Sequence, residues 1–134
     1  MITIKDVRQI EFSQLGDERG SLVVLEGNKD VPFEIKRVFY IFGTKEGVVR
    51  GQHANKKTEF VLVNIAGTSK VKAMDSLGNT KEFVLDKSHM GVYLPALIWK
   101  DMYDFSIDSI LLVLASEVYD GGEYIRDKEV FLGV

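Results

Sequence analysis

The stretch RGQHANKKTEF, residues 50–60, places one of the chain's two histidines among groups that could carry out proton chemistry. Residues two apart on a strand point to the same side, so His53 and Asn55, followed by Glu59, could converge inside a barrel. Histidine titrates near neutrality, and a histidine in a water-poor cavity can both remove and return a proton. The stretch therefore indicates a metal site or a metal-free base, with a hydrogen-bonded strand end as the structural alternative.

The same stretch resembles the first motif of the cupin superfamily, in which His-x-His, a later Glu and a second-motif His hold a divalent metal. GVYLPALIWKDM, residues 91–102, resembles the second motif. Here Asn55 replaces the second histidine, and Lys100 stands at the place of the late one. Asparagine is a poor ligand for metals that prefer nitrogen, and a protonated lysine would repel the ion. The residues therefore favour a base without a catalytic metal, and the chain has no cysteine for a thiolate site.

Three arginines stand near expected strand ends: Arg19 in DERGSL, Arg37 in IKRVFY and Arg50 in VVRGQH. An arginine offers a planar fork of donors that suits phosphate oxygens, so two or three that converge could bind a diphosphate. Each one alone is as well explained by a solvated strand end. Arg50 and His53 are three residues apart, so a regular strand would turn them to opposite faces unless Gly51 allows a bulge.

Aromatic side chains are the third ingredient of a possible site, and five stand near expected strand ends: Tyr40, Tyr93, Trp99, Tyr103 and Tyr119. Most aromatic residues in a domain of this size belong to the core. A base or sugar ring could nevertheless stack on one or two of them, and a tyrosine hydroxyl could donate to a developing enolate. The other histidine, His89, precedes an expected strand in a turn-like segment, which indicates a surface or turn position.

Strands must position these side chains, because short apolar runs and period-two alternation recur along the chain. SLVVLE, IKRVFYIF, SKVKAM and KEFVLD are examples, and turn formers such as EGNKD, DSLGN and YDGGE separate them. This pattern predicts an all-β fold, an antiparallel sandwich or barrel, in a single domain over residues 1–134. We expect one short helix in EYIRDKEVFLGV, where Tyr124, Lys128 and Phe131 could share a stripe.

Composition limits the partners of the protein. The 134 residues carry a formal net charge of −3 with both signs mixed, so no global field would attract nucleic acid or an acidic membrane surface. The most apolar run, SILLVLAS, is far shorter than the roughly 20 residues of a membrane helix. We therefore expect neither nucleic acid nor membrane as a partner, and the lack of cysteine is consistent with the cytoplasm.

One strand bears on assembly. In EFVLVNI, residues 59–65, Val61, Val63 and Ile65 share one face and Phe60 and Leu62 share the other, so both faces are apolar and should be covered. A second sheet or a partner subunit would cover the second face. The pattern favours a homodimer, with a sandwich formed wholly within one chain as the alternative.

Four segments resemble the sugar 3,4-ketoisomerases that act on dTDP-4-keto-6-deoxyglucose. They are ERGSLVVLEGNKDVPFEIKRVFYIFGTKEGVVRGQHANKK, GVYLPALIWKDMYDFS, LLVLASEVYD and EYIRD. The resemblance runs from about residue 17 to residue 127. It implies a cupin-type antiparallel barrel or jelly roll, a homodimer, and an isomerase without metal or redox cofactor whose products lead to 3-amino-3,6-dideoxy sugars. It also implies a nucleotide-sugar pocket formed by Arg19, Arg37, Tyr40 and Arg50, in which His53 matches the first histidine of the family's His-x-His.

The implied reaction matches the residues. A C4 ketone acidifies the C3 proton, so one base, His53, can remove it to form an enediol, and a proton returned at C4 leaves the ketone at C3. Asn55 cannot exchange a proton, so His53 acts alone or a second relay such as Tyr103 or a water assists. A catalytically inactive nucleotide-sugar binding module and a 3,5-epimerase acting on the same substrate are the alternatives.

Overall fold

Short strands are the main regular elements of the protein, as the alternating pattern predicts. The structure is a computed structural model and describes residues 1–133. In chain order its elements are η1 (Ile4–Asp6), β1 (Arg8–Glu11), β2 (Gln14–Asp17), β3 (Gly20–Val23), β4 (Arg37–Phe42), β5 (Arg50–Asn55), β6 (Phe60–Ala66), β7 (Ser69–Met74), β8 (Thr80–Leu85), β9 (Met90–Leu94), β10 (Trp99–Tyr103), β11 (Ile110–Ala115), η2 (Gly121–Glu123), β12 (Tyr124–Ile125) and α1 (Lys128–Leu132).

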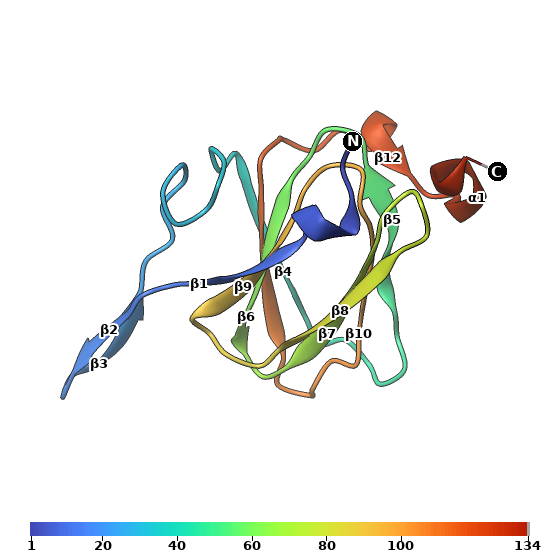
Figure 1. The fold of residues 1–134 in the computed structure, drawn as a ribbon. Helices are drawn as coiled ribbons and strands as arrows, with labels where there is room; N and C mark the ends of the chain where they lie inside the picture. The colour runs from blue at the N-terminus through green and yellow to red at the C-terminus, as the bar shows by residue number, and fades with distance from the viewer. Residues whose placement is uncertain (134) are drawn as a thin grey trace.

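Two five-stranded antiparallel sheets face each other (Figure 1). The first has the order β1-β9-β6-β11-β4 and the second has the order β12-β5-β10-β7-β8. Alternation decides which side chains enter the space between them: on β7, Val71 and Ala73 are fully buried while Lys72 between them is exposed. The all-β prediction of a barrel or jelly roll is confirmed.

Strand β6 buries both faces over its first five residues within this one chain, whereas Ile65, expected on a covered face, is 47% exposed. Phe60 and Leu62 point into the core between the sheets. On the other face, Val61 and Val63 pack against Val31 and other side chains of the segment between β3 and β4. The chain's own segment therefore covers the face that was expected to need a second sheet or a partner subunit.

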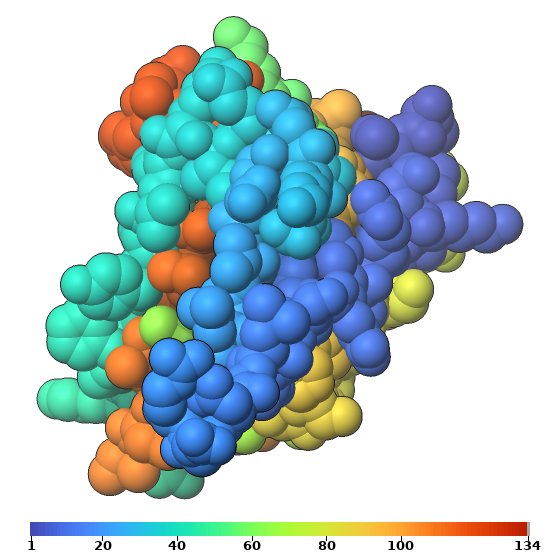
Figure 2. All heavy atoms as spheres, turned by 90° about the vertical axis from the view of Figure 1, so that its left-hand side faces the viewer, coloured from blue at the N-terminus to red at the C-terminus, as the bar shows by residue number. Residues whose placement is uncertain are grey.

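The segment between β3 and β4 does not cover the outer side of the edge strand β4. On its outer side, Val38, Tyr40 and Phe42 are 55%, 61% and 67% exposed, and the rings of Tyr40 and Phe42 stack with centroids 5.8 Å apart. Figure 2 shows the side of the molecule across which the first third of the chain spreads. A strip of large apolar side chains on β4 thus remains open in the single chain.

Two peripheral segments flank the barrel. The hairpin of β2 and β3 projects away from it (Figure 1), and only Val23 at its end is partly buried. At the other end of the chain, Asp127 caps α1, and Phe131 packs on Trp99 with ring centroids 5.8 Å apart. No helix within residues 1–133 is long and apolar enough to cross a membrane.

The expected C-terminal helix forms, but it is shorter than the stripe that predicted it. Lys128 and Phe131 lie in α1, whereas Tyr124 belongs to the two-residue strand β12. The prediction that all three share a helix is wrong, because Tyr124 pairs with Asn55 on β5 and Asp127 starts the helix only afterwards.

Candidate active site

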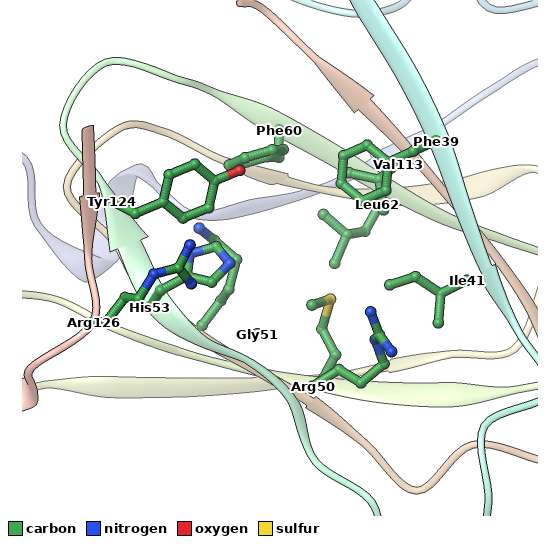
Figure 3. A pocket seen from close by; sticks show the side chains of 12 residues that line it. Phe39, Ile41, Arg50, Gly51, His53, Phe60, Leu62, Val113, Tyr124 and Arg126 are labelled. Atoms are coloured by element: carbon green, nitrogen blue, oxygen red, sulfur yellow. The ribbon is translucent and has the colours of Figure 1, made fainter. Parts of the chain in front are cut away.

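A cavity of about 240 Å³ lies between the two sheets (Figure 3). The first sheet contributes only apolar side chains to it, which are Phe39, Ile41, Phe60, Leu62 and Val113. The second sheet and the residue after β12 contribute every polar side chain of the lining, together with Gly51 and Met102; these polar residues are Arg50, His53, Lys100, Tyr124 and Arg126. The cavity therefore has one apolar wall and one basic wall.

A bulge in β5 places Arg50 and His53 on the same side. Opposite β10, His53 pairs with Lys100 and Gly51 pairs with Asp101, so Gln52 has no partner in the ladder. Gly51 and Gln52 have φ angles of 85° and 56°, in the left-handed region that glycine adopts most readily. The three-residue spacing would turn Arg50 and His53 to opposite faces of a regular strand, and the bulge is the exception that brings both to the cavity.

His53 lies in the basic wall in a partly buried position. Its ring is 4.8 Å from the ring of Tyr124, and its Nδ1 is buried with no hydrogen-bond partner in residues 1–133. Burial, followed by the positive charges of Lys100 and Arg126, lowers the pKa of His53 to about 3. At neutral pH the ring is therefore uncharged and can accept a proton.

Lys100 is 3% exposed, and its ammonium is held by a buried polar chain. The Nζ donates to Asn55 Oδ1 over 3.3 Å, and Asn55 Nδ2 donates to Glu123 Oε1 over 2.6 Å. The Thr58 hydroxyl also donates to Glu123. The Nζ lies 4.5 Å from the centre of the Phe60 ring. Burial lowers the pKa of Lys100 to about 7, against an opposing effect of the Glu123 carboxylate.

The residues at the cupin ligand places do not suit a divalent metal. The Asn55 oxygen already accepts from the Lys100 ammonium, and Glu59 accepts from the Tyr93 hydroxyl and does not line the cavity. No group of three or more His, Asp or Glu side chains in residues 1–133 is arranged to hold a metal ion. Asn55 serves the buried polar chain instead of presenting a free ligand to the cavity.

The structure brings some of the residues singled out from the sequence to the cavity. Arg50 and His53 line it, and Asn55 contacts the lining residue Lys100. Arg37 lies on the same face of β4 as the lining residue Phe39, and its Nε and Nη2 are buried without a hydrogen-bond partner among the described residues. The Arg37 guanidinium carbon lies 5.5 Å from the Phe39 ring centre.

Other residues singled out from the sequence lie elsewhere in this chain. Arg19 sits at the tip of the β2–β3 hairpin, where it pairs with Asp17 over 2.7 Å. Tyr40 points out of the barrel, and the Tyr103 hydroxyl donates to Glu82 rather than facing the cavity. His89 occupies the turn before β9.

Lys100, Tyr124 and Arg126 line the cavity, although the sequence did not single them out for this role. Lys100 had been considered only as a residue that would repel a metal. Tyr124 and Arg126 had appeared only in the word EYIRD and the expected helical stripe. Tyr124 and Arg126 share one sequence signal, which is the short polar segment EYIRD. It follows the last long strand, where a returning segment can close a barrel. Glu123 is the first residue of EYIRD, but nothing in the sequence showed that its side chain would be buried.

Comparison with known proteins gives consistent results over nearly the whole chain. The family model described as FdtA: WxcM-like, C-terminal matches residues 5–134. A TDP-4-oxo-6-deoxy-alpha-D-glucose-3,4-oxoisomerase from Aneurinibacillus thermoaerophilus is 46% identical over 122 residues, which cover 91% of this chain and 87% of that protein.

Two solved structures agree with this result. A TDP-quinovose 3,4-ketoisomerase from Campylobacter jejuni has a TM-score of 0.92 at 41% identity, with 98% of this chain and 100% of that chain covered. A histidine-to-asparagine variant of a 3,4-ketoisomerase from Thermoanaerobacterium thermosaccharolyticum, in complex with TDP-4-keto-6-deoxyglucose, has a TM-score of 0.93 at 35% identity, with 97% and 94% covered.

Proposed function

Since the chain belongs to the FdtA family (WxcM-like, C-terminal), we propose that it moves the keto group of dTDP-4-keto-6-deoxyglucose from C4 to C3. Its relatives with matching length and fold are named sugar 3,4-ketoisomerases. A C3 ketone is the group that an aminating enzyme needs, so the product suits the synthesis of 3-amino-3,6-dideoxy sugars. The observation that most supports the proposal is the place of His53 in a cavity whose basic wall also holds Arg50 and Arg126.

His53 is the proposed base. Its neutral ring takes the C3 proton, which the neighbouring ketone acidifies, and the electrons of the broken C–H bond form the C3–C4 double bond of an enediol. The O3 proton is removed and O4 gains one, and return of the carbon-bound proton to C4 then leaves the ketone at C3. The negative diphosphate of the substrate would raise the pKa of His53 in the complex, which makes the ring a stronger base once substrate is bound. Hydrogen and electrons stay within the substrate, so no redox cofactor is needed.

The two walls suggest how the substrate lies. Arg50 and Arg126 present guanidinium forks to the cavity, which suit the diphosphate oxygens. Arg37, with two buried nitrogens that lack a partner in residues 1–133, is a third candidate beside them. The apolar wall, with Phe39 and Phe60, would pack against the sugar face and keep water from the enediol.

We also propose that the protein acts as a homodimer, which accounts for the open strip on β4. Exposed apolar patches of this kind mark interaction sites. The β2–β3 hairpin exposes Leu15 and Leu22, each 57%, and could pack on the strip Val38, Tyr40 and Phe42 of a second copy.

The same arrangement accounts for Arg19. Strand β4 is the edge of its sheet and also lines the cavity with Phe39 and Ile41. A partner hairpin crossing β4 would therefore bring its Arg19 towards the mouth of the cavity. Substrate binding by Arg19 is thus proposed to occur across the subunit interface.

Incubation with dTDP-4-keto-6-deoxyglucose in deuterated water, followed by NMR, tests the function. We expect the C3 proton signal to disappear as the 3-keto product forms. Absence of both C3 exchange and product would contradict the proposal. Tight dTDP binding without turnover would instead support a binding module, and exchange at C5 with the ketone still at C4 would support a 3,5-epimerase.

His53→Asn tests the base with little change in shape. We expect a loss in turnover of about 10²–10⁴-fold, since this is the usual contribution of a general base. His89→Asn is the matched control, because His89 lies in a turn outside the cavity lining. Equal activity of the His53 variant and the wild type would remove His53 from the mechanism.

A further inference from the structure

Lys100 faces His53 across the ladder between β10 and β5. Both side chains line the cavity, and both belong to the wall that holds its polar groups. A lysine with 3% of its surface exposed is unusual, because burial of an ammonium is costly unless the charge is paired. The position of Lys100 therefore needs an explanation beyond packing.

The surroundings of Lys100 leave its amine able to hold or release a proton. Its only hydrogen bond in residues 1–133 goes to Asn55 Oδ1, a neutral acceptor, and the Glu123 carboxylate is reached only through the Asn55 amide. The other charged or titratable groups of the cavity lining are His53 and Arg50 from β5, Tyr124 from β12 and Arg126 after it. With a pKa of about 7, both forms of Lys100 are present near neutral pH.

Given the proposed function, on which this inference depends, we propose that Lys100 is the second proton carrier of the isomerisation and moves the oxygen-bound proton from O3 to O4. In the first half, His53 takes the C3 proton, the C–H electrons form the C3–C4 double bond, and the carbonyl electrons move to O4, which takes a proton from the Lys100 ammonium. In the second half, the Lys100 amine takes the O3 proton, the C3 ketone forms, and C4 takes the proton from His53.

The two groups end as they began. His53 gains and loses one proton, Lys100 loses and regains one, and the substrate exchanges a C3 hydrogen for a C4 hydrogen and an O3 hydrogen for an O4 hydrogen. The developing charge on O4 meets a preorganised donor in a cavity with an apolar wall, where such a donor is most effective. Asn55, which cannot carry a proton, and Glu123 act as positioning residues that hold the Lys100 Nζ.

Lys100→Arg and Lys100→Met test the proposal. Arginine keeps the positive charge but does not release a proton at these pH values, and methionine has a similar length without either property. We expect both variants to lose turnover by about 100-fold or more, the usual range for acid–base groups, and to keep their affinity for dTDP. Lys72→Arg and Lys72→Met, at an exposed position on the neighbouring β7, should keep wild-type activity.

The pH profile of the wild type gives a second measurement that needs no variant. Because the ammonium must be present at the start, kcat/KM should fall as the pH rises through about 7, and His53, with a pKa of about 3, should add no acid limb near 6.5. A flat profile from pH 6 to 9, or a Lys100→Arg variant with wild-type turnover, would overturn the role of Lys100. In either case a wild type that forms the 3-keto product leaves the proposed function standing, whereas a wild type without product removes the function itself.

Discussion

At the scale of single residues, the site depends on two groups that burial moves away from their ordinary titration. Desolvation penalises the charged form of both His53 and Lys100, so His53 stays neutral while Lys100 titrates near neutral pH. Acid–base sites typically contain two titratable groups whose environments move their pKa values apart, so that each takes a different role. Asn55 connects Lys100 to Glu123 and so links the cavity to the buried carboxylate.

The free energy of unfolding should depend on pH because Lys100 titrates at different pH values in the folded and unfolded states. Its pKa is about 7 in the folded state and 10.5 ordinarily, so between these values the unfolded state binds more protons. The contribution of this group to the free energy of unfolding therefore rises with pH from about 7 to 10 and is lost as the pH falls through 7. We expect urea unfolding at pH 7, 8 and 9 to show a smaller rise for Lys100→Met than for wild type. Lys72→Met should follow the wild type; a parallel rise in all three proteins would contradict the buried titration.

Glu123 should control the pKa of Lys100 through its charge. The carboxylate raises this pKa, so Glu123→Gln, which keeps the shape, should lower it and move the alkaline limb of kcat/KM to lower pH. A variant that only loosened the fold would lower activity at all pH values without moving the limb. Glu82→Gln is the control, since Glu82 accepts from Tyr103 outside the cavity lining.

At the scale of elements, the bulge in β5 decides whether the cavity has the proposed base, His53, and the proposed phosphate-binding residue, Arg50, on the same side. At the bulge, where Gly51 and Gln52 have positive φ angles, β5 has one residue more than the facing part of β10. Arg50 and His53 both face inward as a result. The strand β12 then pairs with β5 and supplies Tyr124 next to His53.

Gly51→Ala should damage both the fold and the site. A Cβ at Gly51 would lie 2.9 Å from the Lys100 carbonyl oxygen and 3.0 Å from Met102 Cε, at a φ of 85° that alanine rarely adopts. We expect a loss of about 1–3 kcal/mol in the free energy of unfolding and a lower kcat, because the close contact is with the backbone of β10.

Gly78→Ala is the matched control for the bulge. Gly78 has nearly the same φ, 86°, but nothing lies within 4 Å of its Cβ position. Gly78→Ala should lose only about 1 kcal/mol in the free energy of unfolding, from the left-handed backbone conformation, and should keep full activity. If both variants lost activity equally, the close approach at Gly51 would not be the cause.

The elements also show what the sequence could predict. Period-two alternation predicted the strands. The three-residue spacing of Arg50 and His53 indicated that both could face one side only if a bulge formed at Gly51, because strand side chains alternate. The family words predicted the ketoisomerase resemblance, which the family model and relatives confirm. The placement of Tyr124 was wrong, since helical spacing cannot reveal that a two-residue strand pairs with Asn55 far away in sequence.

At the scale of the whole molecule, the single chain completes its core but not all of its surface. The segment between β3 and β4 covers the outer face of β6, so a face expected to meet a partner is closed internally. The strip on β4 remains exposed, and the hairpin of β2 and β3 projects away from the barrel (Figure 1). Single-strand patterns cannot predict this, because they do not show which segment of the same chain folds back.

The proposed homodimer should be sensitive to a charge on the β4 strip. Tyr40→Asp places a carboxylate in the centre of the strip, and we expect it to shift the protein from dimer to monomer in sedimentation velocity. Val84→Asp, at an exposed apolar position on β8 in the other sheet, is the control and should remain dimeric. A wild type that sediments as a monomer would contradict the proposed dimer.

Mixing two variants that should each be inactive alone, Arg19→Ala and His53→Asn, tests whether Arg19 acts in the cavity of the partner subunit. In a dimer formed from an Arg19→Ala chain and a His53→Asn chain, one cavity would contain both an intact His53 and an intact partner Arg19. After unfolding and refolding of an equal mixture, we expect about a quarter of wild-type activity, since random pairing makes half of the dimers mixed and each has one intact site. Arg19 acting within its own chain would give no recovery.

The long separation in sequence between Glu123 and its partner Asn55 has a consequence for how the enzyme is made. A ribosome synthesises β5 and β10 before residues 121–126, and a domain generally folds as a unit. A nascent chain at that point has the barrel strands, but Lys100 and Asn55 lack their carboxylate partner and the cavity lacks Tyr124 and Arg126. The complete cavity therefore forms only after translation has passed these residues, and a chain interrupted earlier would lack part of its lining.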